Sequence, residues 1–128
     1  MAKSKVVLIV EDDPSMMRLY SDVFYLSGYK VEKAFNGEDG LKKVKEVMPA
    51  VILLDVMMPK MDGIKVLEHL KADKKTRNIP VVMLTNIAKD TLGAAEAALK
   101  KGAVRYIVKS DHEPDQVVGI VEEVLSGK

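Results

Sequence analysis

The sequence contains no cysteine, and histidine occurs only twice among its 128 residues. Disulfide bonds and thiolate metal sites are therefore excluded, which is consistent with a reducing compartment. No apolar run approaches the roughly 18 residues that a membrane-spanning helix requires. A signal peptide is not expected, because the first apolar run, Val6–Val10, is followed directly by three acidic residues. With a net charge of +1, which offers no overall attraction to nucleic acid, we expect a cytoplasmic protein that contacts neither nucleic acid nor a membrane directly.

Short apolar runs alternate along the chain with stretches of helical periodicity. The segments expected to form strands are Val6–Val10, Lys30–Ala34, Val51–Leu54, Val81–Leu84 and Tyr106–Val108. Helices are expected at about 14–27, from 36 or 37 to 48, at about 63–72, within 89–101, and from about 114 onward. This alternation indicates an α/β fold with a parallel sheet and right-handed crossovers. The length and a hydrophobic content of 48% fit a single domain, 1–128.

Local signals mark the ends of several helices. Asp13 followed by Pro14 indicates an N-cap and the first helical position, and Asp62 is a second N-cap candidate. Gly102 is expected to end the fourth helix. The apolar residues at helical spacing in the first helix are Met16, Leu19, Tyr20, Val23 and Phe24. The second strand is more polar than the others, so it is expected at a sheet edge.

Polar residues stand where the expected strands end. In chain order they are Glu11, Asp12, Asp13, Asp55, Thr85 and Lys109. The carboxyl ends of parallel strands lie on one edge of the sheet, where ligands bind. Carboxylates that meet there repel one another unless a cation neutralises them, and oxygen ligands favour Mg²⁺. A metal beside Asp55, a hydroxyl at Thr85 and an ammonium at Lys109 would bind a tetrahedral dianion, as phosphoryl transfer requires.

Four segments resemble the receiver domains of response regulators in two-component signalling. They are the acidic cluster after the first strand, Leu-Leu-Asp-Val-Met-Met-Pro-Lys-Met-Asp-Gly at 53–63, Leu-Thr at 84–85, and Lys-Lys-Gly-Ala-Val-Arg-Tyr-Ile-Val-Lys at 100–109. The resemblance covers essentially the whole chain, which is similar in size to the single-domain chemotaxis regulator. It implies a flavodoxin-like, doubly wound fold with five strands in the order 2-1-3-4-5. It also implies a phosphorylation-activated switch that is not a metabolic enzyme.

Carried over residue by residue, the resemblance implies that Asp55 is the phosphoacceptor. It would receive the phosphoryl group from a sensor histidine kinase, a phosphotransfer protein or a small phosphodonor. Asp12 would bind Mg²⁺ directly and Glu11 directly or through water, with Mn²⁺ as a possible replacement. Asp55 and the backbone carbonyl of Met57 would complete the protein ligands. Asp13 is assigned to helix capping instead.

The same resemblance implies that Lys109 and the Thr85 hydroxyl contact the phosphoryl oxygens. Tyr106 matches an aromatic switch position that turns inward as Thr85 moves toward the phosphate; simple packing is the alternative role for this tyrosine. Phosphorylation would bias a surface made of the fourth helix, the fifth strand and the fifth helix, which binds a downstream target. The domain is expected to be a monomer, or a weak dimer when phosphorylated.

Three features depart from the commonest receiver pattern. Ser110 stands where many receivers have proline after the active lysine, so the geometry of the Lys109–Ser110 peptide is left open. Asn86 stands where a smaller residue is more usual, which predicts narrower access to the phosphate. The stretch between Thr85 and Gly102 is also about two residues longer than in the chemotaxis regulator.

The residues two positions beyond the acceptor aspartate and the threonine are Met57 and Ile87, and both are apolar. Neither can orient an attacking water, so we predict slow self-dephosphorylation. Met57 also argues against a phosphatase of the haloacid dehalogenase type, which would want an acid at this position. A second rival is a phospho-independent interaction module or an engineered scaffold on the receiver fold. The presence of all the site residues argues against it.

Overall fold

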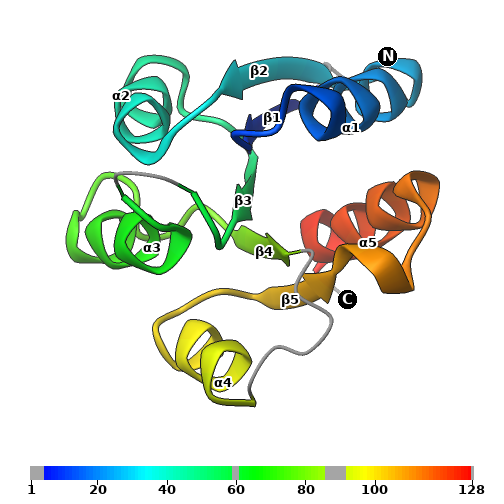
Figure 1. The fold of residues 1–128 in the computed structure, drawn as a ribbon. Coiled ribbons are helices and arrows are strands. Elements are labelled where there is room, and N and C mark those ends of the chain that lie inside the picture. Colours follow the sequence, from blue (N-terminus) through cyan, green and yellow to red (C-terminus); the bar gives the residue numbers. More distant parts are fainter. Residues whose placement is uncertain (1–4, 59–60, 86–91, 128) are drawn as a thin grey trace.

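The computed structural model describes residues 5–58, 61–85 and 92–127, with the side chains of 92–95 excepted. The strands are β1 (Val6–Val10), β2 (Lys30–Ala34), β3 (Val51–Asp55), β4 (Val81–Thr85) and β5 (Arg105–Val108). The helices are α1 (Pro14–Leu26), α2 (Gly37–Val47), α3 (Gly63–Ala72), α4 (Leu92–Lys100) and α5 (Pro114–Ser126) (Figure 1). A short 3₁₀ turn, η1 (Lys109–Asp111), follows β5. The predicted alternation of strands and helices is confirmed, with small shifts at the element ends.

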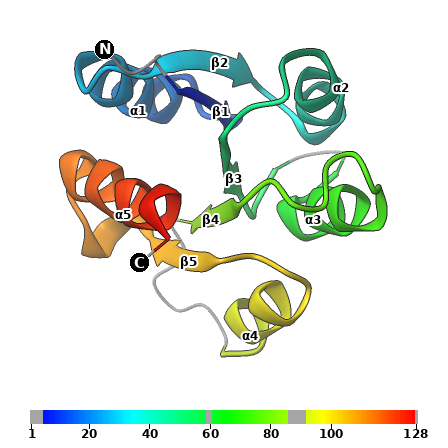
Figure 2. The same cartoon turned by 180° about the vertical axis from the view of Figure 1, so that it is seen from behind.

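The five strands form one parallel sheet in the order β2-β1-β3-β4-β5, which confirms the expected topology. All residues of β3 and β4 are buried, because helices cover both faces of the sheet. Helices α1 and α5 lie on one face, and α2, α3 and α4 lie on the other (Figures 1 and 2). As predicted, β2 lies at an edge, and Ala34 is its one fully buried residue.

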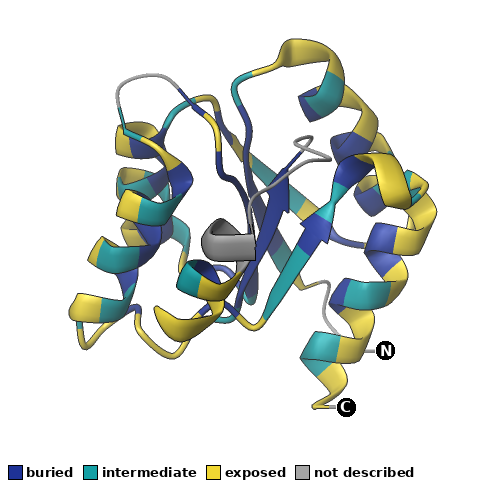
Figure 3. Cartoon of the chain, turned by 60° about the horizontal axis from the view of Figure 1, so that its bottom comes forward, coloured by how far each residue is buried: buried dark blue, intermediate teal, exposed yellow. Residues whose placement is uncertain are grey.

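Successive residues of the strands enter different cores, because side chains alternate across a sheet. Leu8 packs in the core beneath α2, α3 and α4, whereas Val7 packs in the core beneath α1 and α5. Buried residues line the sheet and the inner helix faces, and exposed residues cover the outside (Figure 3). Leu19 shares the helical spacing of the other apolar residues of α1, yet this residue is 44% exposed. The buried arc of α1 instead runs through Met17, Tyr20, Ser21 and Phe24, and position 19 lies outside it.

The predicted helix caps are confirmed. The Asp13 carboxylate accepts hydrogen bonds from the backbone N–H of Ser15 at 2.9 Å and of Met16 at 3.5 Å. The Asp62 carboxylate accepts one from Lys65 N–H at 2.9 Å. Gly102 follows α4 with a φ of +113°, a left-handed conformation that favours glycine.

Of the three departures from the receiver pattern, the structure fully describes one, the peptide after Lys109. The described part of the chain contains no cis peptide bond, so the Lys109–Ser110 peptide is trans. Asn86 and Ile87, like much of the long stretch before α4, lie outside the described residues. Among the helices that the structure describes, none has the length and apolar character needed to cross a membrane.

Candidate functional site

The carboxyl ends of β1, β3, β4 and β5 meet at one edge of the sheet and bring buried polar groups together there. Six polar or charged residues of the described part are buried, and four of these belong to this edge. The four are Glu11, Asp55, Thr85 and Lys109, with exposed fractions of 0 to 8%. Buried ionisable groups gathered where a parallel sheet binds ligands are typical of a functional site.

Three acidic side chains form a cluster at this edge. One carboxylate oxygen from each of Glu11, Asp12 and Asp55 lies within 4.8 Å of the others. Glu11 and Asp55 are buried, whereas Asp12 is half-buried. The donor set is all oxygen, and its spacing allows the three carboxylates to share one ion. These residues therefore fit a hard divalent cation such as Mg²⁺, which binds one or two carboxylates and retains waters.

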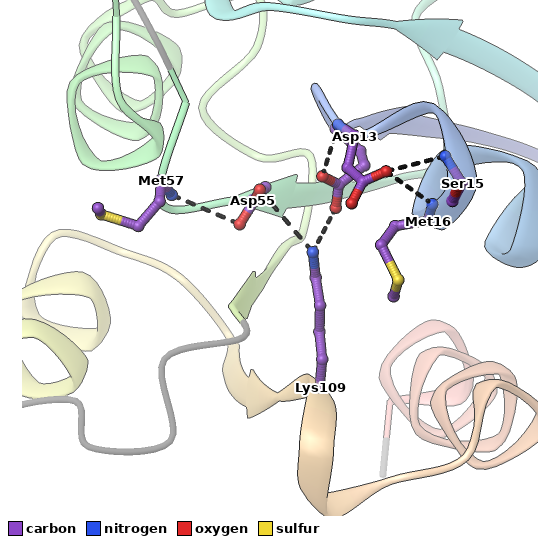
Figure 4. A network of polar contacts seen from close by, with 7 residues as sticks. Asp13, Ser15, Met16, Asp55, Met57 and Lys109 are labelled. Carbon is purple, nitrogen blue, oxygen red and sulfur yellow. Dashed lines mark hydrogen bonds and ion pairs between the residues drawn. The ribbon is translucent and has the colours of Figure 1, made fainter.

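Lys109 lies between two of these carboxylates. Its Nζ forms an ion pair with Glu11 and lies 3.8 Å from Oδ2 of Asp55 (Figure 4). Glu11 also accepts a hydrogen bond from the Asp13 backbone N–H at 3.1 Å. The Lys109 ammonium thus contacts two carboxylates of a cluster that contains three, which leaves negative charge for a cation to neutralise.

The electrostatic environment reflects this excess of acid. Burial raises the pKa of Asp55 from 3.8 to about 7, Lys109 opposes this shift, and the charge of Glu11 adds to it. The pKa of Tyr20, a buried residue of α1, is raised to about 12, first by burial and then by the charges of Glu11 and Asp55. The sequence pattern placed Tyr20 among the apolar residues of the first helix, but it contained no signal that the tyrosine hydroxyl lies close enough to Glu11 and Asp55 to be affected by their charges.

The backbone around Asp55 is held by α3 through a contact that the sequence pattern did not reveal. Met57 N–H donates to Oδ1 of Asp55 at 3.4 Å, and Gly63 N–H donates to the Val56 carbonyl at 2.8 Å. A Cβ on Gly63 would lie 2.2 Å from the Asp55 carbonyl oxygen, closer than real contacts allow. Glycine is therefore required at the start of α3 so that the helix can approach the residue at the end of β3.

The residues expected on β4 and β5 lie on neighbouring strands. Thr85 is opposite Val108 in the strand register, and Met83 is opposite Tyr106. Because side chains alternate along strands, Thr85 and Tyr106 are on the same face of the sheet. Tyr106 is half-buried and packs against the core on the side of α2, α3 and α4. Six of the seven site residues predicted from the sequence thus lie at the carboxyl ends of the strands, whereas Tyr106 lies within β5, two residues before its end.

The family model described as "Response regulator receiver domain" matches residues 7–122. The chain belongs to the response regulator receiver family. Its structure also resembles solved members, including a putative response regulator from Chloroflexus aurantiacus at 30% identity and a TM-score of 0.88, with 97% of this chain and 99% of that one covered. The chemotaxis protein CheY4 of Vibrio cholerae aligns at 26% identity and a TM-score of 0.86, covering 94% and 98% of the two chains.

Curated relatives of this receiver domain differ in length. The polar-differentiation regulator DivK of Brucella anthropi is 34% identical over 122 residues, which cover 95% of this chain and 94% of DivK. By contrast, the match to the transcriptional regulator RpaA of Synechocystis, at 40% identity, covers 62% of this chain and 33% of RpaA. The chain likewise spans 25% of the regulatory protein AtoC of Escherichia coli. The receiver is thus similar both to single-domain proteins and to one part of longer regulators.

Membership of the family establishes the general function of the domain. Receiver domains accept phosphoryl groups from histidine kinases, bind Mg²⁺ in an acidic pocket, and act mostly as switches instead of enzymes. This chain is such a phosphorylation-activated switch, and the cluster of Glu11, Asp12 and Asp55 fits the phosphorylation site.

Proposed function

We propose that Asp55 is the residue that accepts the phosphoryl group. The observation that carries this proposal is the position of its carboxylate, which belongs to the acidic cluster and lies 3.8 Å from the Lys109 ammonium. In the transfer, an Asp55 carboxylate oxygen forms a bond to phosphorus. The P–N bond of a phosphohistidine, or the P–O bond to the acetyl group of acetyl phosphate, breaks as the leaving atom takes the electron pair.

The acidic cluster would hold the metal ion that this reaction uses. Asp12, Glu11 and Asp55 would provide carboxylate oxygens, and the backbone carbonyl of Met57 would provide a fourth. Mg²⁺ is the expected ion, and Mn²⁺ accepts the same ligands. When bound, the ion neutralises charge on the transferred group. Lys109 would contact a phosphoryl oxygen, because its ammonium already lies 3.8 Å from the Asp55 carboxylate.

The signal would leave the site through β4 and β5. Thr85 would donate its hydroxyl to the phosphoryl group, and Tyr106, on the same sheet face, would turn inward in response. This change would bias the surface formed by α4, β5 and α5 toward the form that binds a downstream protein. A sensor histidine kinase or a phosphotransfer protein would supply the phosphoryl group in the cytoplasm, and phosphorylation would at most favour a weak dimer.

Intact mass spectrometry after incubation with acetyl phosphate and Mg²⁺ tests the assignment. The wild-type chain should gain one phosphoryl group, and Asp55→Asn should gain none. Asp13→Asn is the matched control, because this exposed residue caps α1 and asparagine caps a helix equally well. Asp12→Asn, or wild type in EDTA, should react far more slowly. Equal phosphorylation of Asp55→Asn and wild type would contradict the assignment.

A further inference from the structure

A groove of about 580 Å³ lies between α1 and the edge strand β2, and its lining includes none of the residues of the phosphorylation site. Its lining residues are Ser21, Asp22, Tyr25, Tyr29, Lys30, Val31 and Lys33. A volume of this size lies within the range of sites that bind small molecules or peptide side chains.

Ser21 lines this groove and carries an unsatisfied hydroxyl. Its side chain is buried in the middle of α1, with the residue 5% exposed, and Oγ has no hydrogen-bond partner. Buried hydroxyl groups are nearly always hydrogen-bonded, because burial without a partner is costly. The Oγ atom itself is inaccessible in this structure, so the Ser21 side chain has to rotate before an acceptor in the groove can satisfy this hydroxyl.

The adjacent strand offers backbone groups for pairing. Lys30 N–H donates to the Lys5 carbonyl at 2.9 Å, and the Ala34 carbonyl accepts from Glu11 N–H at 3.0 Å. Because alternate residues of a parallel strand bond to the same neighbour, the N–H and C=O groups of Val31 and Lys33 point away from β1. Among the described strands, none lies on that outer side of β2.

The charges and aromatic rings of the groove indicate what kind of segment it fits. Lys30 and Lys33 are both exposed, and Asp22 is the single acidic residue of the lining. Tyr25 also lines the groove, and it is 72% exposed. Lysines on an edge strand also discourage unwanted strand pairing. That role explains the lysines but not the unpartnered Ser21 hydroxyl or the exposed tyrosine.

We propose that this groove binds an extended acidic peptide segment of a partner protein, which pairs with the outer edge of β2 and directs a carboxylate toward Ser21 and Lys33. Backbone pairing with Val31 and Lys33 supplies affinity, as in other cases of strand addition to a sheet edge. The Ser21 O–H and the Lys33 ammonium then select for an acidic side chain. This binding is independent of phosphorylation at Asp55.

Two matched peptides provide the probe, both seven residues long and fluorescently labelled. One alternates valine with glutamate, and the other alternates valine with glutamine. Fluorescence anisotropy with the full chain should show the glutamate peptide binding about tenfold more tightly than the glutamine peptide. In ¹H–¹⁵N spectra the amide signals of Val31 and Lys33 should shift upon addition of the glutamate peptide.

Variants assign the binding to the groove. Ser21→Ala and Lys33→Glu should each weaken binding of the glutamate peptide about fivefold or more, and both should still be phosphorylated by acetyl phosphate. Lys45→Glu makes the same charge change on the exposed side of α2, outside this groove, and should bind like wild type. Val31→Pro removes an outward N–H at an edge position where proline is tolerated, and should also weaken binding.

The inference is overturned if the glutamate peptide leaves the Val31 and Lys33 signals unshifted. It is equally overturned if both peptides bind alike, or if Lys33→Glu and Lys45→Glu weaken binding to the same extent. In those cases the lysines of β2 serve only to protect the sheet edge from unwanted strand pairing. Because phosphorylation is measured separately on each variant, failure of this inference is distinguishable from failure of the assignment of Asp55.

Discussion

Replacing Asp55 by asparagine should make the protein more stable at neutral and alkaline pH, although it removes the proposed phosphoacceptor. Asp55 is 6% exposed and shares one lysine with the equally buried Glu11. Burial raises its pKa from 3.8 to about 7, so the folded protein resists its ionisation. Asparagine has nearly the same shape and carries no charge. Lys109 keeps its partner Glu11 in this variant.

The expected change in the free energy of unfolding follows from the direction and size of the pKa shift of Asp55. The folded pKa lies above the unfolded pKa, so the stability that protonated Asp55 contributes is fully present below pH 3.8 and is lost as the pH rises through about 7. A shift of this size corresponds to at most about 4 kcal/mol, since each pKa unit is about 1.4 kcal/mol. We expect Asp55→Asn to raise the free energy of unfolding by about 2–4 kcal/mol at pH 8, and by about 1 kcal/mol near pH 4.5.

Urea unfolding followed by circular dichroism, in EDTA at pH 8 and pH 4.5, measures both values. Asp22→Asn is the control, because this carboxylate is exposed on α1 and should change stability by less than about 0.5 kcal/mol. If the Asp55→Asn protein were no more stable than wild type at pH 8, the ionised Asp55 would not be destabilised by burial. A gain that was equal at both pH values would refute the reasoning as well.

Three further predictions concern the metal, the backbone and the lifetime of the phosphoryl group. Mg²⁺ at 10 mM should stabilise wild type by about 1.4 kcal/mol if its Kd is about 1 mM, and thermal unfolding of Asp12→Asn should show little of this gain. Gly63→Ala should cost about 1–3 kcal/mol and slow phosphorylation, because its Cβ would collide with the Asp55 carbonyl. Gly119→Ala is the control, because its added Cβ meets nothing within 4 Å, and it should instead stabilise α5 by about 0.5–1 kcal/mol. If the two substitutions changed stability equally, the close approach of Gly63 to the Asp55 carbonyl would not be the cause. The phosphoryl group should be lost slowly after removal of acetyl phosphate, as mass spectrometry over time can show. Met57→Asn should accelerate that loss about tenfold, because an amide can orient the attacking water, and Met57→Ala should not. Rapid loss of the phosphoryl group from wild type would contradict the prediction of slow self-dephosphorylation.

Most of the fold was predictable from the sequence, because it depends on local patterns. The apolar runs at 51–54 and 81–84 are long enough for strands buried on both faces, and the structure confirms that every residue of β3 and β4 is buried. Asp13 and Asp62 cap helices in ways that depend on neighbours two or three residues away. Leu19 shares the helical spacing of its apolar neighbours and is nevertheless exposed, because spacing alone does not show which arc of α1 faces the sheet.

The residues that form the site were also predictable, but the contacts between them were not. Acidic residues after β1 and β3 and a lysine after β5 must approach one another once the strands are parallel and adjacent. The ion pair between Lys109 and Glu11 joins residues 98 positions apart, and the sequence contained no signal for it. The need for glycine at position 63 was hidden for the same reason, since the clash involves the backbone of another element.

The sequence by itself determined the alternation of strands and helices, the helix caps, and the polar residues at the strand ends, because each depends on a few consecutive side chains. Tertiary packing decided which groups touch. It set Lys109 against two acids, brought α3 onto the Asp55 carbonyl, and left the Ser21 hydroxyl without a partner beside an open strand edge. These features arise where distant segments meet, and burial at those contacts sets their charge and hydrogen bonding.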